Sequence, residues 1–264
     1  MTTTTSVSRA GRAASAERTG NQWTPMVALM ISVTLGILDF FIVNVALPDI
    51  QRGFGASASA VEWLVAGYGL TFAVFLIAGG RIADRIGRRR VLAIGIAIFG
   101  AASLLCGIAG GPEMLITARF LQGLGAALVS PTVLSIIGAL YQGTDRRRAL
   151  GIYGLVMGLA AVGGQLVGGL LIRADLFGLG WRTIFLINLP LAGIVLILLP
   201  RTVPESRSPV RHRVDLVGLV GIALGLGALL LPLVEGRQRG WPLWSWLSIA
   251  AAVLIFVAVA GQQR

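Results

Sequence analysis

The stretch that decides the fold is MVALMISVTLGILDFFIVNVAL, residues 26–47, in which Asp39 is the single ionisable side chain. A helix of about 20 apolar residues is long enough to cross the roughly 30 Å hydrocarbon layer of a bilayer. Seven further apolar runs follow, and short charged connectors separate them. Helix is the expected form, because an open sheet would leave unpaired backbone groups in lipid and barrel strands are shorter. The predicted spans are 26–47, 62–80, 91–110, 114–137, 149–172, 183–200, 214–234 and 244–260.

The composition supports a membrane protein. Of 264 residues, 56% are hydrophobic and only 12% are charged, and the mean hydropathy of +0.84 is too high for a soluble domain. The net charge of +11 comes entirely from arginine, since the chain has no lysine. If the amino terminus is cytoplasmic, the arginines gather in the cytoplasmic connectors, as the positive-inside rule requires. We therefore expect a multi-pass protein of the cell membrane with no nucleic-acid partner.

Few residues offer catalytic or metal chemistry. Cys106 is the single cysteine and lies in an apolar run, while the single histidine, His212, lies in a polar connector. No internal disulfide is possible, and no metal site or bound cofactor is expected. An intramembrane protease would need paired catalytic groups within the spans, and the sequence has none. The chain is therefore not expected to be an enzyme.

The two charges inside predicted spans are Asp39 and Arg119. A charge near the bilayer centre costs at least about 2.5 kcal/mol, so it is normally paired or solvated in a cavity. Counted from the outer ends of their helices, Asp39 lies about 12 Å deep and Arg119 about 9 Å deep. If the two helices are neighbours, the arginine would hold the aspartate ionised, and protonation of the aspartate would release the arginine. The alternative is a structural ion pair that locks two helices.

Small residues predict where helices approach closely. In the fourth span, Gln122, Gly123, Ala126 and Ser130 share a face with Arg119. The fifth span carries two close-packing patterns, Gly154 with Gly158 and Gly164 with Gly168. Such a helix either packs tightly or slides and bends.

Four segments resemble a known family. The connector GRIADRIGRRR, residues 80–90, is similar to the signature between helices two and three of the major facilitator superfamily of transporters. RFLQGLGAA, residues 119–127, resembles that superfamily's fourth-helix motif. LDFFIVNVALP, residues 38–48, resembles the first-helix motif of its fourteen-span drug:proton antiporters, the EmrB/QacA type. WRTIFLINLP, residues 181–190, is similar to the entry to helix six in the same branch.

The resemblance implies a domain organisation. Residues 26–200 would form an amino-terminal six-helix bundle of two inverted three-helix repeats, after a disordered cytoplasmic tail, 1–25. A cytoplasmic loop, 201–213, and two linking helices within 214–264 would follow. The carboxy-terminal bundle would be absent, so we expect a fragment of a longer transporter. Assembly from two copies, or with a separately encoded half, is the alternative.

The resemblance also implies site residues. Asp39 and Arg119 would couple transport to a proton gradient, and no other cofactor is implied. The small organic substrate would be a drug or another amphipathic compound, and the membrane lipid and the missing carboxy-terminal half would be the other partners. The supporting residues fall into a group for the substrate cavity or for coupling support, a gating turn and a helix-five hinge: Asn44, Gln122 and Gln165; Gly80, Asp84, Arg85, Gly87 and Arg88; Gly164, Gly168 and Gly169.

Two positions depart from the family pattern. Phe41 stands where the first-helix motif has threonine, which removes a hydroxyl near Asp39. Gln165 stands where the fifth-helix antiporter motif has proline, which removes a covalent reason for a kink. Proton-coupled efflux remains the leading hypothesis, and uptake symport and a non-transporting membrane scaffold are the alternatives.

Overall fold

The computed structural model describes residues 22–208, 216–236 and 239–262. Residues 1–21 of the predicted tail and 209–213 of the predicted loop lie outside this part of the chain. Within it, eight helices are long and apolar enough to cross a membrane, which confirms the expected number. The helices are α2 (Thr24–Phe54), α3 (Ala58–Ile86), α4 (Arg88–Gly107), α5 (Pro112–Leu140), α6 (Gly143–Ala174), α7 (Thr183–Leu186), α8 (Asn188–Thr202), α9 (Leu216–Glu235) and α10 (Leu243–Gln262). Two short 3-10 turns, Leu176–Gly178 and Gly180–Arg182, precede α7.

Most helices extend past the ends of the predicted spans. α2 continues beyond Leu47 through Asp49 and Arg52, and α6 begins at Gly143, ahead of three consecutive arginines. Charged side chains at a membrane surface reach water while the backbone below them stays helical. The charged connectors seen in the sequence are therefore largely helix ends rather than loops.

The sixth span is divided. α7 ends at Leu186 and α8 begins at Asn188, although the sequence predicts a single run over 183–200. Pro190 has no N–H to donate to the carbonyl of Leu186, so one helical hydrogen bond is missing at this point. The break brings Asn188 to the first turn of α8.

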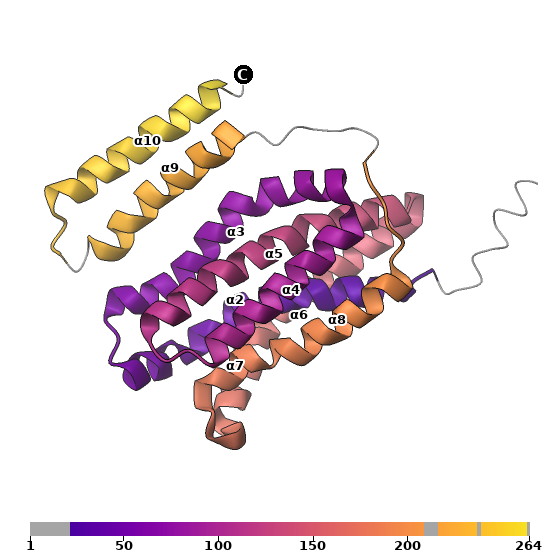
Figure 1. The fold of residues 1–264 in the computed structure, drawn as a ribbon, viewed down its shortest axis with the longest axis horizontal. Helices are drawn as coiled ribbons and strands as arrows, with labels where there is room; N and C mark the ends of the chain where they lie inside the picture. Colours follow the sequence, from indigo (N-terminus) through magenta and orange to yellow (C-terminus); the bar gives the residue numbers. More distant parts are fainter. Residues whose placement is uncertain (1–21, 209–215, 237–238, 263–264) are drawn as a thin grey trace, which may run out of the picture.

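Two helix–helix contacts at α5 organise the bundle. α5 packs between α3 and α4, while α2 lies against α6 and α8 (Figure 1). At Gly123 an added Cβ would overlap the backbone carbonyl of Tyr68, and at Gly125 it would lie 2.8 Å from the backbone nitrogen of Phe99. Backbones this close leave no room for any side chain but hydrogen. The smooth face expected on the fourth span is confirmed.

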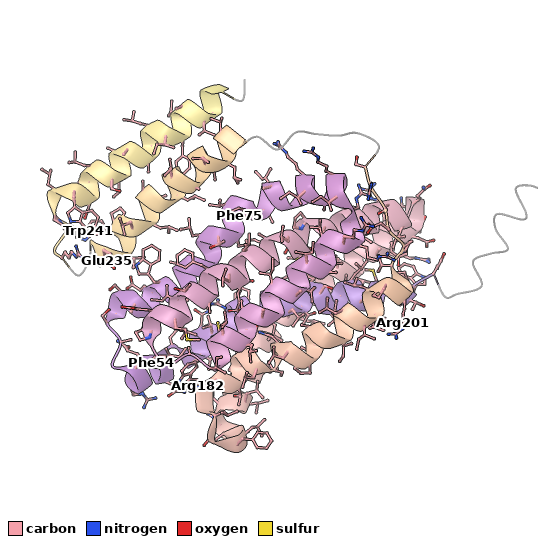
Figure 2. The ribbon with its side chains drawn as sticks, viewed as in Figure 1. Phe54, Phe75, Arg182, Arg201, Glu235 and Trp241 are labelled. Atoms are coloured by element: carbon pink, nitrogen blue, oxygen red, sulfur yellow. The ribbon has the colours of Figure 1, made fainter. Side chains whose placement is uncertain are left out.

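α9 and α10 form an antiparallel hairpin, and α9 lies beside α3 (Figure 1). The indole N–H of Trp63 on α3 donates a hydrogen bond of 3.3 Å to Glu235 at the end of α9. Figure 2 places Glu235 and Trp241 at the same end of the molecule as Phe54 and Arg182, and Arg201 at the opposite end. With a cytoplasmic amino terminus, Arg182 and Glu235 are expected at the outer face of the membrane and Arg201 at the cytoplasmic face, and they lie at opposite ends of the bundle.

We predict that Gly123→Ala destabilises the protein by about 1–3 kcal/mol, because the new methyl group overpacks the α3–α5 contact. Gly151→Ala on α6 is the matched control, since nothing lies within 4 Å of its added Cβ. This control should leave stability unchanged or raise it by up to about 1 kcal/mol through helix propensity. Thermal unfolding of both variants in detergent measures the difference. Equal stability of the two would contradict the proposed packing.

Candidate functional site

Asp39 of α2 and Arg119 of α5 form an ion pair in the interior of the bundle. Arg119 Nη1 donates to Asp39 Oδ2, and both side chains are 0% exposed. They are the two fully buried charged side chains in the part of the chain that the structure describes. The juxtaposition expected from their matching depths is therefore present.

Neutral polar side chains complete the surroundings of the carboxylate. Asp39 Oδ1 accepts hydrogen bonds from Gln122 Nε2 at 3.1 Å and from Asn188 Nδ2 at 2.7 Å. The Gln122 carbonyl oxygen in turn accepts from Arg119 Nη1 at 2.8 Å. Gln122 therefore bridges both charges, and the coupling role that the resemblance implies for it stays a prediction.

The guanidinium is held by backbone and by aromatic rings. Arg119 Nε donates to the carbonyl of Leu64 on α3 at 3.0 Å, whereas Nη2 has no hydrogen-bond partner. The guanidinium carbon lies 4.4 Å from the centre of the Tyr68 ring and 5.9 Å from that of Phe185. Cation–π attraction from these rings partly replaces the missing hydrogen bond.

Three residues of this cluster are not identified by the sequence analysis. Ser103 Oγ on α4 accepts from Gln122 at 2.8 Å and from Asn188 at 3.3 Å, and the Cys106 thiol donates to Gln122 at 3.3 Å. Asn188 lies within a motif quoted above, but its distance in sequence from Asp39 conceals the contact. Ser103 and Cys106 have the residue types and spacing of ordinary core positions, so no sequence signal marks them.

An apolar groove of about 740 Å³ adjoins the ion pair. α2, α3, α5 and α6 supply its lining, which is rich in aromatic side chains and includes Phe40, Phe41, Tyr68, Phe72 and Met157. Phe41, where the resemblance leads one to expect threonine, thus adds an aromatic surface to the groove. The side chain suits a flat apolar ligand better than a hydroxyl would.

Asn44 and Gln165, the other two predicted cavity residues, lie apart from this cluster. Both side chains are exposed in the described structure. Asn44 Nδ2 donates to the carbonyls of Phe40 and Phe41 on its own helix, at 3.2 Å and 3.3 Å. Their roles in a cavity stay predictions.

The three predicted hinge glycines differ in their surroundings. A Cβ at Gly164 would lie 2.8 Å from the Leu38 carbonyl, and one at Gly168 would lie 2.7 Å from Ile42. Nothing lies within 4 Å of a Cβ at Gly169. α6 therefore approaches α2 directly beside Asp39, at Gly164 and Gly168.

The other predicted close-packing pattern of α6, Gly154 with Gly158, does not form a contact with another helix. Nothing lies within 4 Å of an added Cβ at Gly154 or at Gly158. The close packing predicted for this pair is therefore wrong. Gly158 lines the groove, where α6 faces open space instead of another helix.

The predicted gating turn joins α3 to α4 at the end of the bundle where α8 terminates. Asp84 accepts hydrogen bonds from Arg88 Nε at 3.0 Å and Nη2 at 2.8 Å. Gly87 adopts φ = 133°, which disfavours any other residue, and a Cβ there would lie 2.8 Å from the Glu205 carboxylate. Gly80 lies on α3 where an added Cβ would be 3.4 Å from Pro131, and the Arg85 side chain is exposed.

Residues 203–208, here called the strap, lie against this turn. Glu205 Oε1 accepts from the backbone N–H of Arg89 at 3.0 Å, so it caps the start of α4. The strap also exchanges backbone hydrogen bonds with the turn, from Arg88 N to Ser206 O at 2.9 Å and from Ser208 N to Asp84 O at 3.1 Å. The strap is not predictable from the sequence pattern, because it depends on contacts between segments more than 100 residues apart.

The sequence profile of the Major Facilitator Superfamily matches residues 29–261. The chain belongs to this superfamily. Membership in a family of transporters agrees with the absence of an enzyme signature in the sequence, and eight candidate spans make the chain a multi-pass membrane protein.

Three similar curated proteins come from Streptomyces and Mycobacterium species. The chain is 40% identical over 253 residues to "Probable actinorhodin transporter" of Streptomyces coelicolor, covering 96% of this chain and 44% of the relative. It is 38% identical over 237 residues to "Multidrug resistance protein Stp" of Mycobacterium tuberculosis, covering 89% and 42%. It is 39% identical over 249 residues to "Puromycin resistance protein pur8" of Streptomyces alboniger, covering 92% and 48%. The chain thus spans about half the length of the curated relatives it matches.

Solved transporters share the fold. A bacterial homologue of the human lysosomal transporter Spinster, inward-facing and unoccupied, aligns with a TM-score of 0.62 at 23% identity, covering 91% of this chain and 60% of that one. The inward-open xylose transporter XylE from E. coli aligns with a TM-score of 0.60 at 18% identity, covering 91% and 56%. The bundle therefore has the major-facilitator architecture expected from the motifs.

We predict that Gly164→Val disrupts the α2–α6 contact and lowers stability by about 1–3 kcal/mol, because its side chain overlaps the Leu38 carbonyl. Gly169→Val is the control, since its side chain meets open space. Thermal unfolding of the two variants is compared with that of the parent. A Gly164→Val variant as stable as Gly169→Val would show that α6 does not press on α2 beside Asp39.

We further predict that Glu205→Ala releases the strap, because α4 loses its cap and Arg89 and Arg90 lose a counter-charge. The cap alone contributes about 0.5–2 kcal/mol. Trypsin should then cleave after the arginines of the turn faster than in the parent, as followed by mass spectrometry of the fragments. Glu62→Ala, which removes an exposed carboxylate on α3, serves as the control and should leave the cleavage rate unchanged.

Proposed function

We propose that this chain forms the amino-terminal half of a proton-coupled exporter of amphipathic aromatic compounds, such as antibiotics, in the cell membrane. One observation carries the proposal. A fully buried carboxylate, paired with a fully buried guanidinium, lies on the helices that also line an open apolar groove. A titratable group and a ligand surface thus share the same wall.

The ion pair is suited to exchange a proton. The Asp39 carboxylate accepts hydrogen bonds from Arg119, Gln122 and Asn188, so both of its oxygens have donors. A proton on the carboxylate removes the attraction for Arg119, which then keeps the Gln122 oxygen and the Leu64 carbonyl as acceptors. The cluster therefore has one arrangement for each charge state, which is the requirement for proton-coupled switching. A proton gradient, rather than a bound cofactor, would supply the driving force.

The groove indicates the substrate class. Its lining combines aromatic and apolar side chains with little polar surface, so hydrogen bonding would contribute little to recognition. Planar aromatic and lipophilic compounds bind such surfaces through stacking and burial. The names of the relatives, which refer to actinorhodin transport, multidrug resistance and puromycin resistance, support antibiotics as cargo and export as the direction.

A second half is proposed as the partner. The groove has walls from one bundle only, and α6 carries a row of apolar side chains that are 63 to 67% exposed: Leu155, Leu159, Val162, Leu166 and Leu170. An opposing bundle would close the groove and cover part of this row. The positive-inside pattern of the arginines supports a cytoplasmic amino terminus, with the gating turn and the strap on the cytoplasmic side.

We predict that Asp39→Asn abolishes transport driven by a pH gradient, because asparagine cannot accept and release a proton. Cells produce this chain together with the second half of the Streptomyces coelicolor relative. Inverted membrane vesicles from these cells are incubated with ethidium, and uptake of ethidium is followed by fluorescence. The parent should accumulate ethidium when the vesicle interior is acidified, and the variant should not.

Stability needs a control in this experiment, since Asp39→Asn leaves a buried arginine unpaired at a cost of about 3–5 kcal/mol. The double variant with Arg119→Gln removes that charge and should regain thermal stability without regaining transport. Equal uptake by the parent and Asp39→Asn would refute proton coupling through Asp39. Vesicles holding the chain alone test the half-transporter proposal, which is wrong if they load ethidium as fast as the combined halves.

A further inference from the structure

Tyr68 of α3 lies between the apolar groove and the buried ion pair. Its ring is part of the groove lining and packs against two other lining rings, Phe40 at 5.6 Å and Phe72 at 6.4 Å between centroids. The same ring has the guanidinium carbon of Arg119 at 4.4 Å from its centroid. One aromatic side chain therefore contacts both the surface proposed for ligand and the cation that holds Asp39.

Two attachments fix the position of Tyr68. Its hydroxyl donates to the carbonyl of Gly36 on α2 at 2.9 Å, one helical turn before Asp39. Its own carbonyl lies against Gly123 of α5, where the backbones of the two helices meet. The ring thus cannot move far without a shift of α3 against α2 or α5.

The Tyr68 ring helps to stabilise the buried positive charge of Arg119. Arg119 Nη2 is buried without a hydrogen-bond partner, so the aromatic faces around the guanidinium provide its remaining compensation. A compound that packs on the groove side of Tyr68 would displace the ring together with α3, and this displacement would weaken that compensation. Arg119 would then hold Asp39 differently, and the carboxylate would bind its proton with a different affinity.

We propose that Tyr68 is the positioning residue through which a ligand in the groove and the proton on Asp39 affect each other. The inference rests on the proposed function and deepens it, because it names the side chain that transmits the coupling. Linkage requires the effect to be reciprocal: if a bound ligand changes the proton affinity of Asp39 by some factor, protonation of Asp39 must change the ligand affinity by the same factor.

The groups that face Asp39 from each neighbouring helix limit the alternatives. The charged or titratable ones are Arg119 from α5, Tyr68 from α3 and, through Gln122, Cys106 from α4. α6 presents Gly164 and α8 presents Asn188, while α7 presents Phe185 to Arg119. None of these three residues titrates. Among the titratable groups, Tyr68 is the one that also lines the groove.

Two neighbouring rings provide matched controls. Phe72 lines the groove and packs on Tyr68, and no cation–π contact joins it to Arg119 among the described residues. Phe185 has its ring centroid 5.9 Å from the guanidinium carbon and is not part of the groove lining. Substituting each ring in turn separates a loss of ligand surface from a loss of support for Arg119.

The experiment measures binding of tetraphenylphosphonium, an aromatic cation, to the purified full chain at a series of pH values. Protons released on binding are recorded with a pH indicator dye. The variants are Tyr68→Met, Tyr68→Phe, Phe72→Leu and Phe185→Leu. Tyr68→Leu is a second ring-less variant in case Tyr68→Met fails to unfold cooperatively.

The parent should bind the cation with a pH-dependent affinity and release protons. Tyr68→Met should bind with an affinity independent of pH and release none, while Tyr68→Phe keeps the coupling because it keeps the ring. Phe72→Leu should weaken binding by about three- to tenfold with unchanged proton release, the loss expected for one aromatic contact. Phe185→Leu should shift the pH at which protons are released, because it removes one of the rings that support Arg119, and it should keep the coupling, because Tyr68 and the groove remain.

Three results would overturn the inference. The first is a Tyr68→Met variant that loses affinity but still releases protons, as Phe72→Leu is expected to do. The second is loss of coupling in Phe72→Leu and Phe185→Leu as well, which would assign it to general packing. The third is a parent that binds the cation without proton release. A parent that does not bind the cation at all would instead reject the proposed class of ligand, and the inference with it.

Discussion

The burial of one carboxylate against one guanidinium constrains the whole amino-terminal bundle. In a low-dielectric interior neither charge is stable alone, and their pairing is sufficient only if the remaining lone pairs and N–H groups also find partners. Gln122, Asn188 and the Leu64 carbonyl supply most of these partners, and the Tyr68 and Phe185 rings lie against the guanidinium, whose Nη2 has no hydrogen-bond partner. The pair and its hydrogen-bond partners come from α2, α3, α5 and α8, so four helices must converge on one point before the pair can form.

Convergence requires helices that approach one another closely. The glycine contacts of α5 with α3 and α4 draw the backbones together, and Gly164 of α6 meets α2 one residue before Asp39. Because glycine offers no side chain to interlock, such contacts hold helices close without fixing them as firmly as interdigitated side chains do. The polar cluster adds hydrogen bonds between helices that the glycine contacts do not provide.

The polar cluster and the apolar groove are separated by very little material. Tyr68 and its neighbours face the groove on one side and the cluster on the other. This layer of side chains excludes water from the ion pair and keeps the pair close to the groove. At the far end of the bundle, the strap and the turn between α3 and α4 form a second polar network around Glu205 and Asp84. The two networks share α3, whose two ends are thus tied to different parts of the molecule.

The sequence by itself determined the class of the protein and the number of spans, and it marked Asp39 and Arg119 as charges that need a partner. Those features follow from composition and length and from the high cost of an unpaired charge in hydrocarbon, which are local properties of the chain. The contributions of Ser103, Cys106, Asn188 and Tyr68 could not be read from it, since each depends on contacts between helices distant in sequence. The strap and the break between α7 and α8 were missed for related reasons: one needs a long-range contact, and the other a missing hydrogen bond within an otherwise uniform apolar run.

The glycine patterns show the same division. Sequence placed both on one helix, but only the tertiary structure decided that Gly164 and Gly168 meet α2 while Gly154 and Gly158 face open space, because a small residue becomes a contact only where another helix is present.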